Sequence, residues 1–490
     1  MDNQSSSITT PGNLPGGPPA AGPDIAYAGG NPISNWFRSH PVGFWFFFWG
    51  EFAERASYYG MRAILTLYMI DKLGFSKDNA STIMSIFIAM SYLLPLAGGF
   101  IADRFLGKYW TIVGFSFPYI LGHIILGIEE PIYLYIALVL LAMGTGVIKP
   151  NISTLMGNTY DLYRPGQTKL RSEAFAMFYF AINVGAFLSQ VSMPAIRTNI
   201  SYSVAFMFPA ALMVVAFAIF ASGKRFYAQD TPGAYPPTTP EERRQQWQVL
   251  SRLALVFLLI TFFWAIFDQS ATTWIYFAKE NLHDSLMGIP IDPDAVQAFN
   301  PLFIMIFLPI ITVLWRFINV RATDKIMIGF ILTAVVMGVH VFAAWLADST
   351  GQKQSLGWQV GAYLVLTWAE ILISVTGLEL AFTAAPKSMK GFITACWLLT
   401  VFFANFFINA PLSRLYPSDA PGWHFPSAMS YFAFLTGLMV VVSIAFIFVA
   451  QRFNRGMAAW QAEMAANEAV PKLAADGVAS EAIQAKGQEE

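Results

Sequence analysis

Apolar residues occur along this chain in runs long enough to cross a lipid bilayer, separated by short polar stretches. The runs that predict membrane-spanning helices are 43–70, 80–102, 110–128, 131–149, 173–193, 203–222, 248–277, 298–316, 326–346, 358–381, 391–411 and 428–450. The longest polar gap between two runs, 223–247, divides them into six and six. The pattern predicts an all-α membrane protein with 12 transmembrane helices in two six-helix bundles.

The polar segments define the expected domain organisation. Residues 1–40 are rich in Pro, Gly, Ser and Asn and predict a disordered tail, with a helix near Pro41 as an alternative for its end. We expect an N-terminal bundle over 41–222 and a linker over 223–247. A C-terminal bundle over 248–453 and a polar tail over 454–490 follow.

The distribution of lysine and arginine predicts the orientation. If the N-terminus lies inside, the inner loops and helix ends hold seventeen of these residues and the outer loops hold six. We therefore expect both termini, the linker and both tails to be cytoplasmic. The expected location is the plasma membrane, or the inner membrane in a bacterium.

Composition narrows the class of protein. Hydrophobic residues make up 56% of the chain and charged residues 12%, whereas about 25% is charged in a typical soluble protein. The net charge of -1 gives no electrostatic basis for binding nucleic acid. The single cysteine, Cys396, excludes an intrachain disulfide. We find no catalytic or metal-ligand constellation, so we expect no enzyme activity, cofactor or metal.

The first apolar run contains a cluster of charged residues. Each of Glu51, Glu54, Arg55 and Arg62 costs about 2.5–3.5 kcal/mol at the centre of a membrane helix. A helical wheel places all four within about 140° of one another, on the same face as Tyr59. One interpretation is an ion pair that only holds helices together. The surplus charge favours an ion or substrate pathway instead.

The opposite face of this first helix carries small residues. These are Ala53, Ala56, Ser57 and Gly60. Small side chains let the backbones of two membrane helices approach closely. We therefore expect this face to pack against another helix.

Other charges at membrane depth are distributed unevenly between the halves. Lys149 ends the fourth run in a Gly- and Pro-containing segment, where it either reaches back to the interface or faces a cavity. The second half contributes Asp268 and Glu370, with no lysine or arginine at comparable depth. A ligand with a carboxylate and an ammonium group would fit between such halves, which indicates a zwitterion.

Further polar and aromatic residues lie within the spans. They are Tyr92, Asn183, Trp264, Asn300, Ser374 and Trp397. Trp264 shares a helix face with Asp268, and Ser374 shares one with Glu370, because each pair is four residues apart. His123 and His340 also lie in spans, and we interpret both as packing residues.

The segment between the second and third runs resembles the cytoplasmic loop motif of the major facilitator superfamily. The residues of the motif are Gly99, Asp103, Arg104 and Gly107. The two glycines would permit close packing and a tight turn, and Asp103 would accept hydrogen bonds. We expect this segment to act as a conformational latch in a major facilitator superfamily fold.

Several motifs, in the same order, resemble those of the proton-dependent oligopeptide transporter family. They are Glu51-x-x-Glu54-Arg55 followed by Tyr58 to Arg62, the run to Lys149-Pro150, Phe178 to Gly185, Trp264 with Asp268-Gln269, Asn300-Pro301, and Glu370 to Ser374. The matches extend from about Trp49 to Trp397, which is nearly the whole membrane region.

The resemblance implies proton-coupled uptake of di- and tripeptides. Arg62 and Lys149, with Tyr59, would bind the peptide carboxylate, and Glu370 would bind its amino group. The resemblance implies further that Asn183 and Asn300 hold the termini or backbone, and that Tyr92, Trp264 and Trp397 line side-chain pockets. Proton coupling would involve Glu51, Glu54, Arg55 and Asp268.

This chain departs from some members of the family. The 223–247 gap is too short and polar for two extra helices, and the loop near 347–357 is too short for an outer domain. The position of a histidine found in mammalian members is Ser85 here. Proton handling should therefore rest on carboxylates. An alternative is a family member that carries nitrate or a conjugated metabolite, although the intact Glu-Glu-Arg motif favours peptide.

These expectations combine into a mechanism of alternating access by a protein that functions as a monomer. Unprotonated Glu51 or Glu54 would pair with Lys149 or Arg55. Protonation would break the pair and release a basic residue for the peptide carboxylate.

Overall fold

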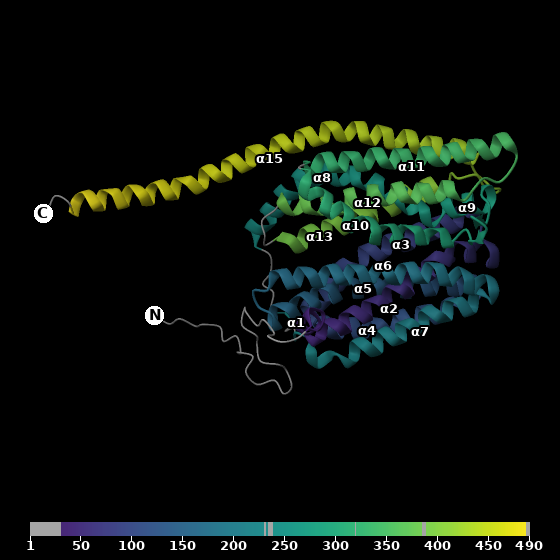
Figure 1. Ribbon diagram of the computed structural model, residues 1–490, viewed down its shortest axis with the longest axis horizontal. Helices are drawn as coiled ribbons and strands as arrows, with labels where there is room; N and C mark the ends of the chain where they lie inside the picture. Colours follow the sequence, from purple (N-terminus) through teal and green to yellow (C-terminus); the bar gives the residue numbers. More distant parts are fainter. Residues whose placement is uncertain (1–30, 230–231, 234–238, 319, 385–388, 487–490) are drawn as a thin grey trace.

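The computed structural model describes residues 31–229, 232–233, 239–318, 320–384 and 389–486. Helices dominate the described residues, and most lie lengthwise beside one another (Figure 1). We call the end of the molecule where α1 and the start of α8 lie the terminal end. The end where α9 lies is the opposite end.

The elements of the first half are α1 (Pro32–Ser39), α2 (Val42–Leu67), the π-helix η1 (Tyr68–Lys72), α3 (Lys77–Ile101), the π-helix η2 (Ala102–Leu106), α4 (Lys108–Leu126), α5 (Pro131–Tyr163), α6 (Thr168–Asn199), α7 (Tyr202–Ser222) and the 3-10 helix η3 (Lys224–Phe226).

The elements of the second half are α8 (Pro240–Phe267), the 3-10 helix η4 (Asp268–Ala271), α9 (Thr273–Asn281), β1 (Ser285–Leu286), β2 (Ile289–Pro290), the 3-10 helix η5 (Ala295–Ala298), α10 (Phe299–Phe317), α11 (Ala322–Thr350), α12 (Gly357–Thr383), α13 (Lys390–Phe403), the π-helix η7 (Ala404–Asn409), α14 (Ala410–Ser413) and α15 (Ala428–Lys486). The strands β1 and β2 pair antiparallel, with Ser285 opposite Pro290.

The described residues contain eleven helices that are long and apolar enough to cross a membrane. A further helix, α2, has 26 residues and carries the four charged residues of the first apolar run. It lies along α6 and α7 within the same bundle. The all-α membrane fold predicted from the sequence is confirmed.

Each half has its own apolar core. One cluster of buried side chains comes almost entirely from the helices of the first half, and another from those of the second half. In Figure 1 these helices form a purple-to-teal group and a green-to-yellow group. The halves meet where α3 packs against α13 and where α6 packs against α10.

Small residues bring α2 and α6 together, as their pattern predicts. A Cβ atom added to Gly60 would lie 2.8 Å from the side chain of Met193, and one added to Gly185 would lie 2.7 Å from the carbonyl oxygen of Phe52. These distances leave no room for a side chain. The close approach fixes the face of α2 that carries its charges.

Several helix boundaries differ from the limits of the predicted segments. Helix α1 covers most of residues 31–40, in agreement with the expected alternative of a helix near Pro41, and residues 1–30 of the predicted tail lie outside the described residues. Helix α8 begins inside the predicted linker because Thr239 and Glu242 form a reciprocal capping box. Residues 487–490 of the predicted C-terminal tail also lie outside the described part, and α15 continues through its earlier residues to Lys486.

Two other differences affect the site. The predicted span 248–277 is interrupted by η4, which begins at Asp268. Helix α5 continues to Tyr163, so Lys149 lies within the helix rather than at its end. An interpretation of Lys149 as a side chain reaching out from a helix terminus is therefore wrong.

Candidate functional site

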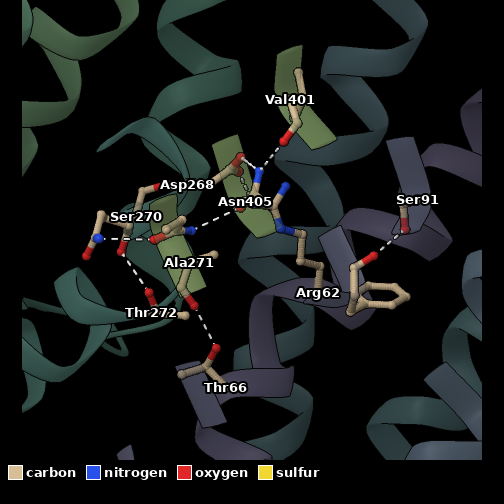
Figure 2. Close-up of polar contacts among 12 residues, drawn as sticks. Arg62, Thr66, Ser91, Asp268, Ser270, Ala271, Thr272, Val401 and Asn405 are labelled. Atoms are coloured by element: carbon tan, nitrogen blue, oxygen red, sulfur yellow. Dashed lines mark hydrogen bonds and ion pairs between the residues drawn. The ribbon is translucent and has the colours of Figure 1, made fainter. Parts of the chain in front are cut away.

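A charged contact joins the halves near the middle of the molecule. The Nη2 atom of Arg62 in α2 lies 2.6 Å from Oδ1 of Asp268 in η4. The other carboxylate oxygen of Asp268 accepts a hydrogen bond of 2.7 Å from Asn405 in η7. Figure 2 shows the Asp268 carboxylate beside Asn405 and Arg62. The guanidinium and amide groups together hold the Asp268 carboxylate in place.

Buried polar side chains extend this contact into the second half. Asn409 donates to Oδ1 of Asn405 at 3.0 Å, and Gln269 donates to Oδ1 of Asn409 at 3.0 Å. The hydroxyls of Thr273 and Tyr431 in turn donate to Oε1 of Gln269, at 2.6 and 2.8 Å. Because each of these buried polar groups has a hydrogen-bond partner, the network avoids the free-energy cost of unpaired polar groups in an apolar core.

A cavity of about 140 Å³ lies between the halves and includes Arg62 and Asp268 in its lining. Of the predicted substrate residues, the structure brings together Tyr59, Arg62, Tyr92, Asn183, Trp264, Asn300 and Glu370. Residues from α2, α3 and α6 thus face residues from α8, α10 and α12 across one space. The predicted proton-coupling residue Asp268 lies in the same wall.

Glu370 supplies a carboxylate to this cavity from α12. Its Oε2 atom accepts a hydrogen bond of 2.7 Å from Nδ2 of Asn300, which also donates to Oγ1 of Thr367 at 3.2 Å. Asn300 therefore orients the Glu370 side chain. No described side chain forms an ion pair with Glu370, so its charge is available to a ligand.

Lys149 lies next to the cavity without belonging to its lining. Its ammonium group lies 4.5 Å from the ring centroid of Tyr92, and Tyr92 itself faces the cavity. This is the geometry of a cation–π contact. Within the described residues Lys149 forms no ion pair. Of the two partners left open for Glu51 and Glu54, Lys149 or Arg55, Lys149 is therefore not the one used in this conformation.

Ser374 and Trp397 lie outside the cavity lining. Ser374 follows Glu370 by one turn of α12. Trp397 is buried and packs edge-on against Phe257, and its ring fills the space beside Gly377 of α12. The prediction that Trp397 faces the ligand space is therefore wrong for this conformation.

The Glu51, Glu54 and Arg55 cluster is buried in the first half, away from the cavity lining. Each of the three residues is at most 2% exposed. Nε of Arg55 lies 3.1 Å from Oε1 of Glu51, and Arg55 also forms an ion pair with Glu54. Two carboxylates thus share one guanidinium, so the cluster is electrically neutral when one of the carboxylates carries a proton.

Five polar residues of the cavity lining were not predicted from the sequence. These residues are Tyr179, Gln190, Ser270, Gln297 and Tyr363. Tyr179 lies within the Phe178 to Gly185 motif, so its position carried a signal. Gln297 lies in η5, where its amide donates to the carbonyl oxygen of Ala63 in the other half at 3.2 Å.

Charged contacts also join the halves at the opposite end. Arg197 of α6 lies 2.8 Å from Asp294, and Lys279 lies 2.5 Å from Asp71. Lys77 pairs with Glu280. These contacts hold the opposite end closed in this conformation.

Two features of this closed end involve acid–base groups. Nε2 of His424 lies 2.8 Å from Oδ2 of Asp78, across the two halves. Asp294 is fully buried, and this burial raises its pKa to about 6, although Arg197 acts in the opposite direction. Asp294 is therefore a group that can gain a proton in mildly acidic solution.

The predicted latch forms a turn at the terminal end. Gly107 adopts φ +75°, which explains the need for glycine there, and Lys108 lies 3.1 Å from Asp103. The carbonyl oxygen of Asp103 accepts a hydrogen bond of 2.9 Å from Gly233, in the connection between the halves. Arg104 is exposed at this turn.

The close packing expected of Gly99 is wrong, because a Cβ atom there would meet nothing within 4 Å. A Cβ atom added to the neighbouring Gly98 would instead lie 2.7 Å from Cα of Val147, so Gly98 is the glycine that permits close packing. The conformational role of the latch stays a prediction.

The two bundles and the cavity between them define a membrane transporter of the major facilitator superfamily fold. A solved structure described as the POT family transporter PepTSo is 28% identical in sequence and aligns with a TM-score of 0.74. The alignment covers 85% of this chain and 99% of that one. A POT peptide transporter solved in complex with alafosfalin is 25% identical, with a TM-score of 0.75, over 86% of this chain and 96% of that one.

The sequence model of the POT family matches residues 109–241 and 239–417. The chain belongs to the POT family.

Relatives of known sequence align with this chain over different fractions of their own length. "Peptide transporter family 1" of Drosophila melanogaster is 32% identical over 60% of this chain and 46% of the relative. Human "Solute carrier family 15 member 1" is 29% identical over 65% and 54%. The chain thus spans about half the length of these animal relatives. "Uncharacterized transporter YclF" of Bacillus subtilis is 27% identical over 83% of this chain and 94% of the relative.

Proposed function

We propose that this protein is a proton-coupled symporter that imports di- and tripeptides by alternating access. The observation that carries the proposal is the presence of Arg62 from one half and Glu370 from the other in the lining of a single cavity. A peptide in water has a carboxylate at one end and an ammonium group at the other. Opposite charges on opposite halves suit such a ligand, and binding it would draw the halves together.

The residues around the cavity have distinct proposed roles. Arg62 and Lys149, with Tyr59, bind the peptide carboxylate, and Glu370 binds the amino group. Asn183 and Asn300 bind the termini or backbone, and Tyr92 and Trp264 line the side-chain space. The name of the Drosophila relative, "Peptide transporter family 1", and the solved structure described as a POT peptide transporter support a peptide substrate.

Ser374 and Trp397 have an indirect proposed role. Neither residue lines the cavity: Ser374 lies one turn along α12 from Glu370, and Trp397 packs beside Gly377 of the same helix. Their packing would hold Glu370 at the right depth in the cavity.

Proton coupling follows from carboxylates that already hold the basic residues. Arg62 is engaged by Asp268, so protonation of Asp268 would free its guanidinium for a peptide carboxylate. Arg55 is shared by Glu51 and Glu54. Protonation of one of these glutamates would leave Arg55 paired with the other, and the two charges of that pair would cancel. Each of these protonation steps leaves an arginine with one fewer carboxylate partner. A peptide carboxylate can then take the place of the lost partner.

The proposed membrane arrangement places the terminal end in the cytoplasm, because the lysines and arginines of the predicted loops concentrate there. The protein would lie in the plasma membrane and function as a monomer. Residues 41–222 and 248–453 would move as two bundles joined by the 223–247 connection. The conformation seen here would be closed to the outside.

A competition assay in proteoliposomes tests the substrate class. Uptake of labelled dialanine should be reduced by unlabelled dialanine, only weakly by N-acetyl-dialanine, and not by nitrate. Inhibition by nitrate with no effect of dialanine would overturn the peptide proposal and favour the alternative substrate. Equal inhibition by dialanine and its acetylated form would overturn the role of Glu370.

A further inference from the structure

A groove between α8 and α15 lies at the terminal end, away from the cavity. Its volume is about 310 Å³. Its polar lining consists of the two guanidinium-bearing residues Arg252 and Arg452, with Ser251 beside them. The lining contains no carboxylate, and neither arginine forms an ion pair with a described side chain. The groove therefore concentrates positive charge.

Both arginines mark the same boundary of the membrane. Residues 253–267 of α8 and residues 428–451 of α15 contain no Asp, Glu, Lys, Arg or His. Arg252 and Arg452 are the first charged residues beyond these apolar stretches. The indole ring of Trp460 lies 5.0 Å from the Arg252 guanidinium, and tryptophan is typical of the membrane–water interface.

The other wall of the groove is apolar. Leu255, Val449, Phe453 and Met457 form it. Further along the same two helices, Leu258 is 53% exposed and Phe448 is 67% exposed. These exposed apolar side chains form a surface that can contact the acyl chains of lipids. The surface begins next to Arg252 and Arg452.

A second groove on α15 offers a natural comparison. It lies between α11 and α15 and contains Arg321 and Arg455. Arg321 is engaged by Asp324, with Nε 2.8 Å from Oδ2 and Nη2 3.3 Å from Oδ1. That groove therefore contains its own carboxylate, and an anionic ligand would bind there more weakly.

We propose that the groove between α8 and α15 binds an anionic phospholipid from the leaflet at the terminal end. Arg252 and Arg452 bind the phosphate, and an acyl chain lies along the apolar wall. Guanidinium groups suit phosphate because their N–H donors match its oxygens in pairs. The apolar wall favours a lipid over free phosphate, and basic pockets between membrane helices are known to recognise lipid headgroups.

The test compares lipid retention by the full-length protein in detergent micelles. Native mass spectrometry should detect bound dioleoylphosphatidylglycerol, and this lipid should raise the melting temperature more than dioleoylphosphatidylcholine does. We expect Arg252→Gln and Arg452→Gln each to reduce retained phosphatidylglycerol at least fivefold. The matched control is Arg455→Gln, which removes the same charge one turn further along α15. This variant should retain phosphatidylglycerol.

Three outcomes would overturn the proposal. The first is retention of phosphatidylglycerol by both groove variants at the level of the unmodified protein. The second is an equal loss in Arg455→Gln, which would indicate a general effect of charge. The third is an equal rise in melting temperature with inorganic phosphate alone, which would indicate a free anion as the ligand.

Discussion

Arg62 and Asp268 connect the two halves of the molecule by a contact of 2.6 Å in the wall of the cavity. The same Asp268 carboxylate is bonded to Asn405, so its position is fixed from the second half. Under the proposed function, a peptide carboxylate that approaches Arg62 would compete with Asp268. This competition would link substrate binding to protonation.

Replacement of Asp268 by Asn should uncouple transport from the proton gradient. The change keeps the side-chain shape but leaves the Arg62 guanidinium without its carboxylate, and breaking a buried pair in this way costs about 3–5 kcal/mol. We expect at least a tenfold fall in gradient-driven uptake of dialanine in proteoliposomes. The control Asp284→Asn removes an exposed carboxylate at the opposite end and should leave uptake unchanged. Full accumulation by Asp268→Asn would refute the role of this contact.

Replacement of Glu370 by Gln should weaken peptide binding selectively. Asn300 can still bond to the side chain, but the negative charge that would attract an ammonium group is gone. We expect at least a tenfold rise in KM for dialanine, which corresponds to about 1.4 kcal/mol. Discrimination between dialanine and N-acetyl-dialanine should also disappear.

The control for Glu370 is Glu379→Gln, which changes an exposed carboxylate on the same helix. It should keep the original KM and the original discrimination. If Glu370→Gln still distinguishes the acetylated peptide, the amino group is recognised elsewhere.

Acidification should favour closure of the opposite end through Asp294. Burial raises its pKa to about 6 in the closed conformation, and exposure to water on opening returns it toward about 3.9. The closed form therefore binds the proton more tightly, so its population relative to the open form rises as pH falls from 6 to 4. The contribution approaches a tenfold change for each pH unit.

Distances between spin labels test this dependence on pH. Labels at Glu130→Cys and Gln352→Cys, both exposed at the opposite end, report its opening in a background where Cys396 is replaced by Ala. The Asp294→Asn variant should lose this component of the pH response. A response of the same size in that variant would show that other groups control closure.

Two glycine substitutions should have opposite effects on thermal stability. Gly185→Ala places a Cβ 2.7 Å from the backbone oxygen of Phe52, so α2 and α6 must separate. Such overpacking costs about 1–3 kcal/mol. Gly99→Ala meets nothing within 4 Å and gains about 0.5–1 kcal/mol from restricting the unfolded chain. We expect a lower melting temperature for the first variant and an unchanged or higher one for the second.

The apolar pattern was sufficient to predict the helical fold, because a membrane span must bury its backbone polar groups within one helix. The charges within those spans predicted the three charged residues of the cavity lining, Arg62, Asp268 and Glu370, because each is costly without a partner. Residues such as Gln297 and Tyr363 were missed because polar side chains near helix ends are common. Only their tertiary position brings them to the cavity.

Pairing between charges was harder to predict than their presence. The sequence left open whether Glu51 and Glu54 pair with Lys149 or Arg55, and the structure pairs both with Arg55. The choice of partner depends on distances between helices. The pattern of residues along one helix gives no information on those distances. The same limitation explains Trp397, whose ring packs against its own bundle.

The most direct test of the central claim is accumulation of labelled dialanine in proteoliposomes under an imposed proton gradient. We predict that the protein concentrates dialanine when the outside is acidic and that a protonophore abolishes this concentration. Glu54→Gln should fail to concentrate dialanine while it still exchanges labelled for unlabelled peptide. Concentration of dialanine by Glu54→Gln on the gradient would contradict the coupling assignment. Absence of gradient-driven dialanine uptake by the unmodified protein would contradict the account as a whole.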